Sequence, residues 1–238
     1  MTITEALCLF AAGAANILGA LAVVSHKHWS KSAIEMLIAL AAGFMLAVSL
    51  LDIIPESMSV HGETALLVVL AGYFLVHLTQ HTLTEHFHFG EETHAVSRLV
   101  GQTALVGLLL HTFVDGVAIV SAFESDEQLG LLVFMAITLH KFPEGLAVAS
   151  ICIAAGMGRK LALMAAMILG LATLLGGILT GPIAVLRDFG LPLSGGVTLY
   201  VAASNLVPEF QAKRGWRLPL FFLLGCVLYF VSRSLLLR

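Results

Sequence analysis

Charged side chains are scarce in this sequence, and their scarcity excludes an ordinary soluble domain. Asp, Glu, Lys and Arg make up 11% of the 238 residues, whereas soluble domains carry roughly 25%. Apolar types make up 59%. The net charge of −3 provides no basic surface, so we expect no nucleic-acid partner. This composition predicts an all-α polytopic membrane protein whose surroundings are the lipid bilayer.

The sequence has few cysteines and no basic region at its N-terminus. The three cysteines, Cys8, Cys152 and Cys226, lie in separate apolar runs, which disfavours a disulfide framework. No lysine or arginine precedes the first apolar run, so we interpret that run as a retained span and not as a cleaved signal peptide. Because the loops are short, residues 1–238 are predicted to form a single transmembrane domain.

Eight apolar segments have about the 20 residues that a bilayer-spanning helix needs. They cover roughly 3–25, 33–56, 64–86, 99–122, 129–155, 159–183, 190–210 and 217–236. Eight spans place both termini on one side. The loops on the other side hold eight basic residues: Lys27, Lys31, Arg98, Arg159, Lys160, Lys213, Arg214 and Arg217. The loops on the side of the termini hold three: Arg187, Arg233 and Arg238. The positive-inside rule therefore predicts that both termini are extracytoplasmic.

Two of these spans contain the same phrase, His-x-Phe-x-acid-Gly-aliphatic-Ala, which begins at His111 and again at His140. Ionisable groups inside a membrane are costly and are functional by default. In each copy the histidine and the acid are four residues apart, so they share one face of a helix. Two such faces supply two imidazoles and two carboxylates, which suit Zn, Fe, Mn, Co or Cd. We therefore predict a divalent-cation site formed by His111, Asp115, His140 and Glu144.

A second phrase, Asx-x-x-Pro-Glu, also occurs twice, at 52–56 and at 205–209. For this phrase and for the histidine phrase alike, the two copies lie on spans that cross the membrane in opposite directions. Transporters often place their site between such inverted repeats. The pattern predicts a 3+2+3 arrangement, in which helices 1–3 and 6–8 are related halves that flank helices 4 and 5.

Polar side chains at the two faces of the membrane suggest a path for the cation. Asp52 and Glu56 lie on the acid-rich side of the termini and are interpreted as an entrance. On the opposite side, an exit is predicted from four residues: His77, His81, Glu85 and Glu209. It is followed by a histidine-bearing cytoplasmic loop at about 86–98. The alternative interpretation is a hydrated helix end with ordinary solvated loop residues.

Lys141 lies three residues before Glu144, and the two are close on one helix. Its ammonium would lower the cost of a carboxylate pair in low dielectric and would repel a second metal ion. A snorkelling or purely structural lysine is the alternative. Met45, on the second span, is interpreted as core filler or as a weak neighbour of the metal.

With these motifs, the chain resembles the ZIP (Zrt-, Irt-like) family of metal-ion transporters over its whole length. The resemblance implies alternating access, with helices 1, 4, 5 and 6 moving against helices 2, 3, 7 and 8. It also implies that the metal ligands are the two His–acid pairs, with Met45 beside them. Some members hold a second metal through an Asn, an acid and a further acid on helix 6. In this chain the first two of those positions are Thr112 and Lys141, and helix 6 contains no acid. We therefore expect one bound ion. Thr112 could orient a water or ligand.

The leading hypothesis is a carrier that brings Zn²⁺, or Fe, Mn, Cd or Co, into the cytoplasm as its transported substrate. A membrane-embedded metallohydrolase is an alternative, but no His-Glu-x-x-His motif is present, and we expect no enzyme. A channel or a metal sensor that uses the same site is a further alternative. The short loops favour a bacterial inner membrane, and the sequence leaves a homodimer open.

Overall fold

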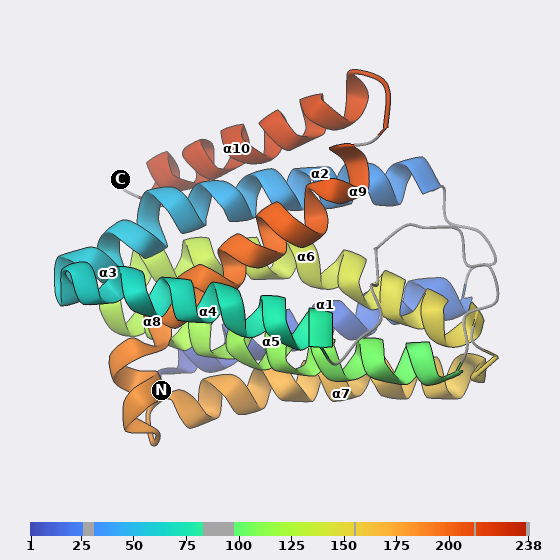
Figure 1. Ribbon diagram of the computed structural model, residues 1–238, viewed down its shortest axis with the longest axis horizontal. Coiled ribbons are helices and arrows are strands. Elements are labelled where there is room, and N and C mark those ends of the chain that lie inside the picture. Colours follow the sequence, from blue (N-terminus) through green and yellow to red (C-terminus); the bar gives the residue numbers. More distant parts are fainter. Residues whose placement is uncertain (26–30, 83–97, 155, 212, 237–238) are drawn as a thin grey trace.

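The computed structural model describes residues 1–25, 31–82, 98–154, 156–211 and 213–236, and this part of the chain contains helices and no strand. Long helices lie side by side (Figure 1). The first half of the chain forms α1 (Ile3–Ser25), α2 (Lys31–Val48), η1 (Ser49–Ile53), α3 (Ile54–His61), α4 (Glu63–Thr82) and α5 (Arg98–Ser125). The second half forms α6 (Glu127–Ala154), α7 (Gly158–Thr180), α8 (Ala184–Tyr200), η2 (Val201–Leu206), α9 (Pro208–Gln211) and α10 (Arg217–Leu236).

Seven of the eight expected spans are long and apolar enough to cross a membrane in the described part of the chain. They are Ile3–Ser25, Glu35–His61, Glu63–Gln80, Leu108–Ser125, Glu127–Ser150, Gly158–Thr180 and Arg217–Leu236. The remaining expected span, 190–210, is also helical, but it is divided among α8, η2 and α9. The start of α1 and the end of α10 lie at the same end of the bundle (Figure 1). The chain is therefore a multi-pass membrane protein.

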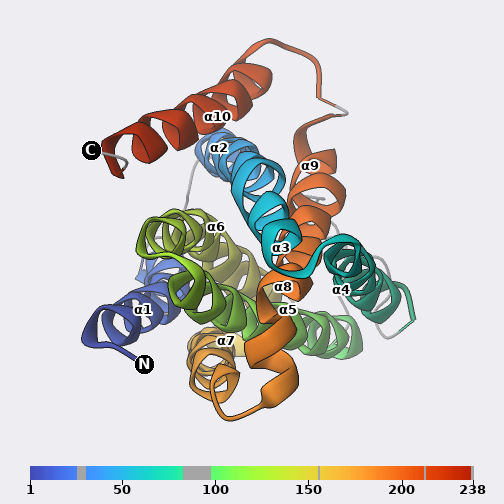
Figure 2. The same ribbon diagram turned by 90° about the vertical axis from the view of Figure 1, so that its left-hand side faces the viewer.

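The helices form two groups, seen along the bundle in Figure 2. The site group consists of α1, α5, α6 and α7, which pack closely with one another. The flanking group contains α2 packed on α10 and α4 packed on α8, with η1, α3, η2 and α9 between them. The two groups meet where α5 contacts α8 and where α2 contacts α6. Both copies of the histidine phrase thus belong to the site group.

Glycines of that phrase bring the site-group helices into backbone contact. A Cβ atom on Gly116 of α5 would collide with the carbonyl oxygen of Thr173 on α7. A Cβ atom on Gly145 of α6 would collide with the carbonyl oxygen of Asn16 on α1. Small residues allow such close approach in membranes, where packing drives helix association. Each His–acid pair is therefore followed by a glycine that holds its helix against a neighbour.

The two copies of Asx-x-x-Pro-Glu share an unusual local conformation. Each begins at the end of a π-helical stretch, which is η1 for the first copy and η2 for the second. In each copy, the backbone N–H of the residue before the proline donates a hydrogen bond to the carbonyl five residues earlier. Ile54 donates to Ser49, and Val207 donates to Ala202. The proline that follows has no N–H of its own to continue the ladder. Such π-helical stretches are frequent at functional sites.

Candidate metal centre

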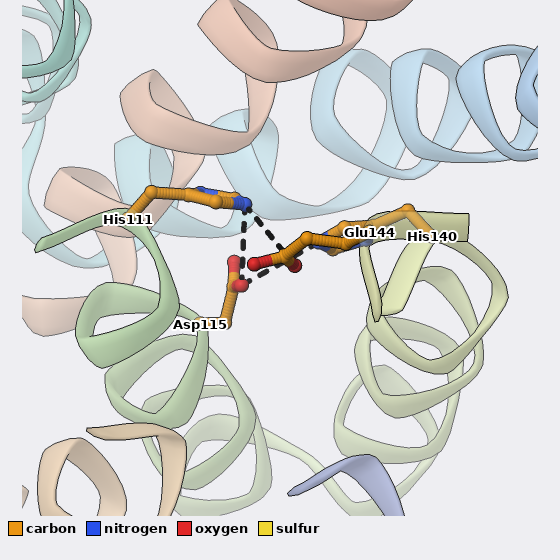
Figure 3. A group of neighbouring side chains, drawn as sticks. All are labelled: His111, Asp115, His140 and Glu144. Carbon is orange, nitrogen blue, oxygen red and sulfur yellow. Dashed lines mark ion pairs between the residues drawn. The ribbon is translucent and has the colours of Figure 1, made fainter. Parts of the chain in front are cut away.

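The packing of α5 against α6 brings His111 and Asp115 opposite His140 and Glu144 (Figure 3). One potential ligand atom from each residue lies within 4.8 Å of the others. Asp115 Oδ2 is 3.4 Å from Nε2 of His111 and 3.4 Å from Nε2 of His140. Two ligands bonded to one tetrahedral Zn²⁺ at about 2.1 Å are separated by roughly 3.4 Å. The arrangement has the spacing of ligands that share one small cation.

All four side chains are buried, with exposed fractions of 3% for His111, 1% for Asp115, 3% for His140 and 3% for Glu144. Nδ1 of His140 donates a hydrogen bond to the carbonyl oxygen of Ala136 at 3.1 Å, which leaves the lone pair on Nε2. Among the described residues, neither Nε2 of His140 nor Oε1 of Glu144 has a hydrogen-bond partner. Buried polar atoms seldom lack partners, so these two atoms are well suited to a cation.

Lys141 is fully buried beside the four residues, with an exposed fraction of 0%. Its Nζ lies 2.6 Å from Asp115 Oδ2 and 3.1 Å from Glu144 Oε2. The contact with Glu144 follows from helical spacing, but the shorter contact with Asp115 crosses from α6 to α5. Sequence reasoning missed the second contact because it depends on how the two helices pack. The hydroxyl of Thr112 donates to the carbonyl of Leu108 and is thus turned to its own helix.

The acids interpreted as an entrance, Asp52 and Glu56, line one cavity of about 390 Å³, which Asp126 and Arg233 also line. Its lining residues include Arg233 and Leu236 of the last turn of α10, which ends at the same end of the bundle as the start of α1 (Figure 1). Glu56 Oε1 accepts a hydrogen bond from Ser125 Oγ at 2.7 Å, which joins α3 to the end of α5. Asp52 and Glu56, the pair predicted from the sequence, thus line the same cavity.

Two residues of α10 hold Asp52, and sequence reasoning did not identify them. The Tyr229 hydroxyl donates to Asp52 Oδ2 at 2.7 Å, and Arg233 Nε lies 3.2 Å from Asp52 Oδ1. The four-residue spacing of a tyrosine and an arginine on an otherwise apolar helix was an available signal. The carboxylate of Asp52 is therefore partly neutralised.

A second cavity, of about 20 Å³, is lined by His111 and Glu144 of the site and also by Ile38 of α2 and Asn205 of η2. This volume is enough for about one water molecule. Asn205 was not among the predicted site residues. It occupies the same place in the second Asx-x-x-Pro-Glu phrase as Asp52 in the first, and this correspondence could have identified it.

The predicted exit is only partly described. His77 on α4 is half-buried, and its ring packs near the rings of Phe74 and Tyr200. Glu85 and most of the histidine-bearing loop, together with the side chains of His81 and Glu209, lie outside the described residues. Met45 is fully buried in the apolar core, and its part as a neighbour of the metal stays a prediction.

A family model described as "ZIP Zinc transporter" matches residues 88–233, which include both histidine phrases and the second Asx-x-x-Pro-Glu phrase. The chain belongs to the ZIP family. Zinc transporter ZupT of Escherichia fergusonii is 32% identical over 178 residues, which cover 71% of this chain and 69% of the relative. Zinc transporter ZIP13 of Pongo abelii is 28% identical over 153 residues, which cover 60% of this chain and 45% of the relative.

Membership of the ZIP family confirms the resemblance drawn from the motifs. This ZIP chain is a divalent-metal transporter. The hydrolase alternative receives no support from these similarities, because the family and the relatives are all described as transporters.

Proposed function

We propose that the chain transports Zn²⁺, or a similar Fe, Mn, Cd or Co ion, through the site formed by His111, Asp115, His140 and Glu144. The observation that carries this proposal is the 3.4 Å spacing between Asp115 Oδ2 and the two histidine Nε2 atoms. The names of the ZupT and ZIP13 relatives support zinc as the substrate. Histidine and carboxylate ligands accept the other metals as well.

One ion is proposed for each chain. The lysine ammonium contacts Asp115 and Glu144, so a second cation beside the first would meet a positive charge at short range. The hydroxyl of Thr112 donates a hydrogen bond to the backbone carbonyl of Leu108, and this side chain supplies no charge. These two residues occupy the places where the family resemblance implies a second site.

Alternating access is proposed as the mode of transport. The ligands are buried, and the adjoining cavity of about 20 Å³ is too small to be a continuous pore. All four ligands lie on the site group, so a shift of this group against the flanking group would carry the whole site. In this proposal Asp52 and Glu56 receive the ion, while His77, His81, Glu85 and Glu209 line its exit.

The 3+2+3 inverted arrangement is proposed for the single domain of residues 1–238, with α5 and α6 between two related halves. The matching five-residue backbone hydrogen bonds before Pro55 and Pro208 support it, because related halves should repeat local conformation as well as sequence. Eight basic residues in the loops opposite the termini, against three on the side of the termini, support extracytoplasmic termini. Transport into the cytoplasm is proposed from the family resemblance. A bacterial inner membrane is the proposed location.

The test is uptake of Zn, Cd, Fe, Mn and Co into proteoliposomes that contain wild type, Glu144→Gln or Glu127→Gln. Glu127 is an exposed acid at the start of the same helix and serves as the matched control. We expect saturable uptake that falls at least about tenfold in Glu144→Gln, since changing even a residue that only supports a metal ligand typically costs 10–100-fold. Uptake should be unchanged in Glu127→Gln. Wild-type rates in Glu144→Gln would place the site elsewhere, and a folded wild type that moves no metal would refute the proposal.

A further inference from the structure

Lys141 is the charged side chain most completely buried among the described residues, and it stands within the proposed metal site. Its Nζ lies between the two carboxylates, 2.6 Å from Asp115 and 3.1 Å from Glu144. Asp115 is on α5 and Glu144 is on α6. One ammonium therefore bridges both helices that carry ligands.

The same carboxylate oxygen faces both the lysine and the histidines. Asp115 Oδ2 is in contact with Nζ of Lys141 and is also the oxygen that lies 3.4 Å from both histidine Nε2 atoms. A cation bonded to that oxygen at about 2.1 Å would lie a few ångströms from the ammonium. Two positive charges that close in a low-dielectric interior repel each other strongly, so metal binding and the lysine contacts compete.

The net charge of the site without a bound metal ion indicates when the lysine contacts are needed. Two carboxylates and one ammonium sum to −1 when the histidines are neutral, whereas two carboxylates without the lysine sum to −2. An uncompensated pair of buried carboxylates is costly. A carrier must return its unloaded site across the membrane in every cycle of net uptake, so this state needs a positive charge at the carboxylates.

We propose that Lys141 is a tethered counter-cation, which takes over both carboxylates when the transported ion leaves and lets the unloaded site return without a proton or a second metal. The proposal rests on the transport function proposed above. It differs from a purely structural ion pair, because it assigns the lysine to one half of the transport cycle and not to the other.

The test separates net uptake from exchange in proteoliposomes. Net uptake into metal-free vesicles requires the return of the unloaded site, whereas exchange of external radioactive zinc for internal zinc does not. Lys141→Met keeps the length of the side chain and removes its charge. Lys160→Met, at an exposed lysine near the start of α7, is the matched control.

For Lys141→Met we expect zinc to bind at least about tenfold more tightly and net uptake to fall at least about tenfold. Exchange should stay within about twofold of the wild-type rate, because exchange does not require the return of an unloaded site. Lys160→Met should match wild type in all three measurements. Lys141→Arg keeps the charge and should retain more net uptake than Lys141→Met. If Lys141→Met does not fold, Lys141→Gln is measured in its place.

Equal loss of net uptake and exchange in a neutral variant that still binds zinc would overturn the proposal. Unchanged net uptake in that variant would overturn it as well. Failure of the transport function itself has a different signature, because wild type would then show neither net uptake nor exchange.

Discussion

Lys141 is the residue at which the proposed stoichiometry of one ion per chain can be tested. Its ammonium contacts both proposed acidic ligands, at the place where related proteins are expected to carry an acid. Replacing it with aspartate would remove the positive charge and add a third carboxylate. We expect Lys141→Asp to bind two Zn²⁺ per chain instead of one, measured by elemental analysis after equilibrium dialysis.

Lys160→Asp is the control for this stoichiometry, because it makes the same change at an exposed position. It should bind one ion like wild type. A ratio of one in Lys141→Asp would show that the lysine does not exclude a second metal.

Arg233 acts at the proposed entrance, where it offsets the charge of Asp52. Arg233→Gln would leave the cavity with three acids, Asp52, Glu56 and Asp126, and no basic residue among those of its lining residues that the structure describes. A more negative cavity raises the local concentration of cations. We expect KM for zinc uptake to fall about twofold or more at low ionic strength and to approach the wild-type value at high salt.

Arg187→Gln is the control, because Arg187 pairs with Asp188 at an exposed position and does not line the cavity. Its KM should equal that of wild type at every ionic strength. A similar fall in both variants would mean that overall charge, and not the Asp52 contact, governs capture.

At the scale of helices, the spacing of the histidine phrases was sufficient to predict which residues share a face. The sequence also predicted the long helices and their order, because apolar length dominates in a membrane. It could not predict that Lys141 contacts Asp115 or that Tyr229 and Arg233 hold Asp52. These contacts join different helices, and their partners depend on how the helices pack. The two π-helical stretches were missed because helix periodicity alone does not register one extra residue in a turn.

The glycines of the repeated phrase are predicted to be packing residues of the site group. In Gly145→Ala the new methyl group would meet the carbonyl of Asn16, and α1 and α6 would have to separate. Overpacking costs about 1–3 kcal/mol, and each kcal/mol lowers Tm by about 2–4 °C at this chain length. We expect a fall of several degrees in the detergent-solubilised protein, together with weaker zinc binding.

Gly181→Ala is the matched control for this helix contact. Gly181 directly follows the end of α7 with φ of −63°, and a Cβ atom there would have no neighbour within 4 Å. Its Tm should not fall. If the two variants unfolded at the same temperature, close contact between α1 and α6 would not contribute to stability.

For the whole molecule, alternating access predicts that linking the two groups stops transport. Glu56 of the flanking group lies 2.7 Å from Ser125 of the site group, so cysteines at these positions would be near neighbours. Lys213 Nζ and Glu35 Oε1 are also 2.7 Å apart, and both residues belong to the flanking side of the molecule, so they provide a comparison pair. Each pair would be introduced after Cys8, Cys152 and Cys226 are replaced with alanine.

A short reversible bis-thiol reagent should abolish zinc uptake by Glu56→Cys/Ser125→Cys, and reduction should restore it, because the linked site group cannot shift against the flanking group. The same reagent should leave uptake by Glu35→Cys/Lys213→Cys nearly unchanged. Each variant is its own reference before linking, so any effect of losing the Glu56 carboxylate is separated from the effect of the link. Full uptake by the linked Glu56/Ser125 pair would exclude relative motion of the two groups at this end. Transport would then have to proceed by side-chain rearrangements around a fixed site, as in a channel.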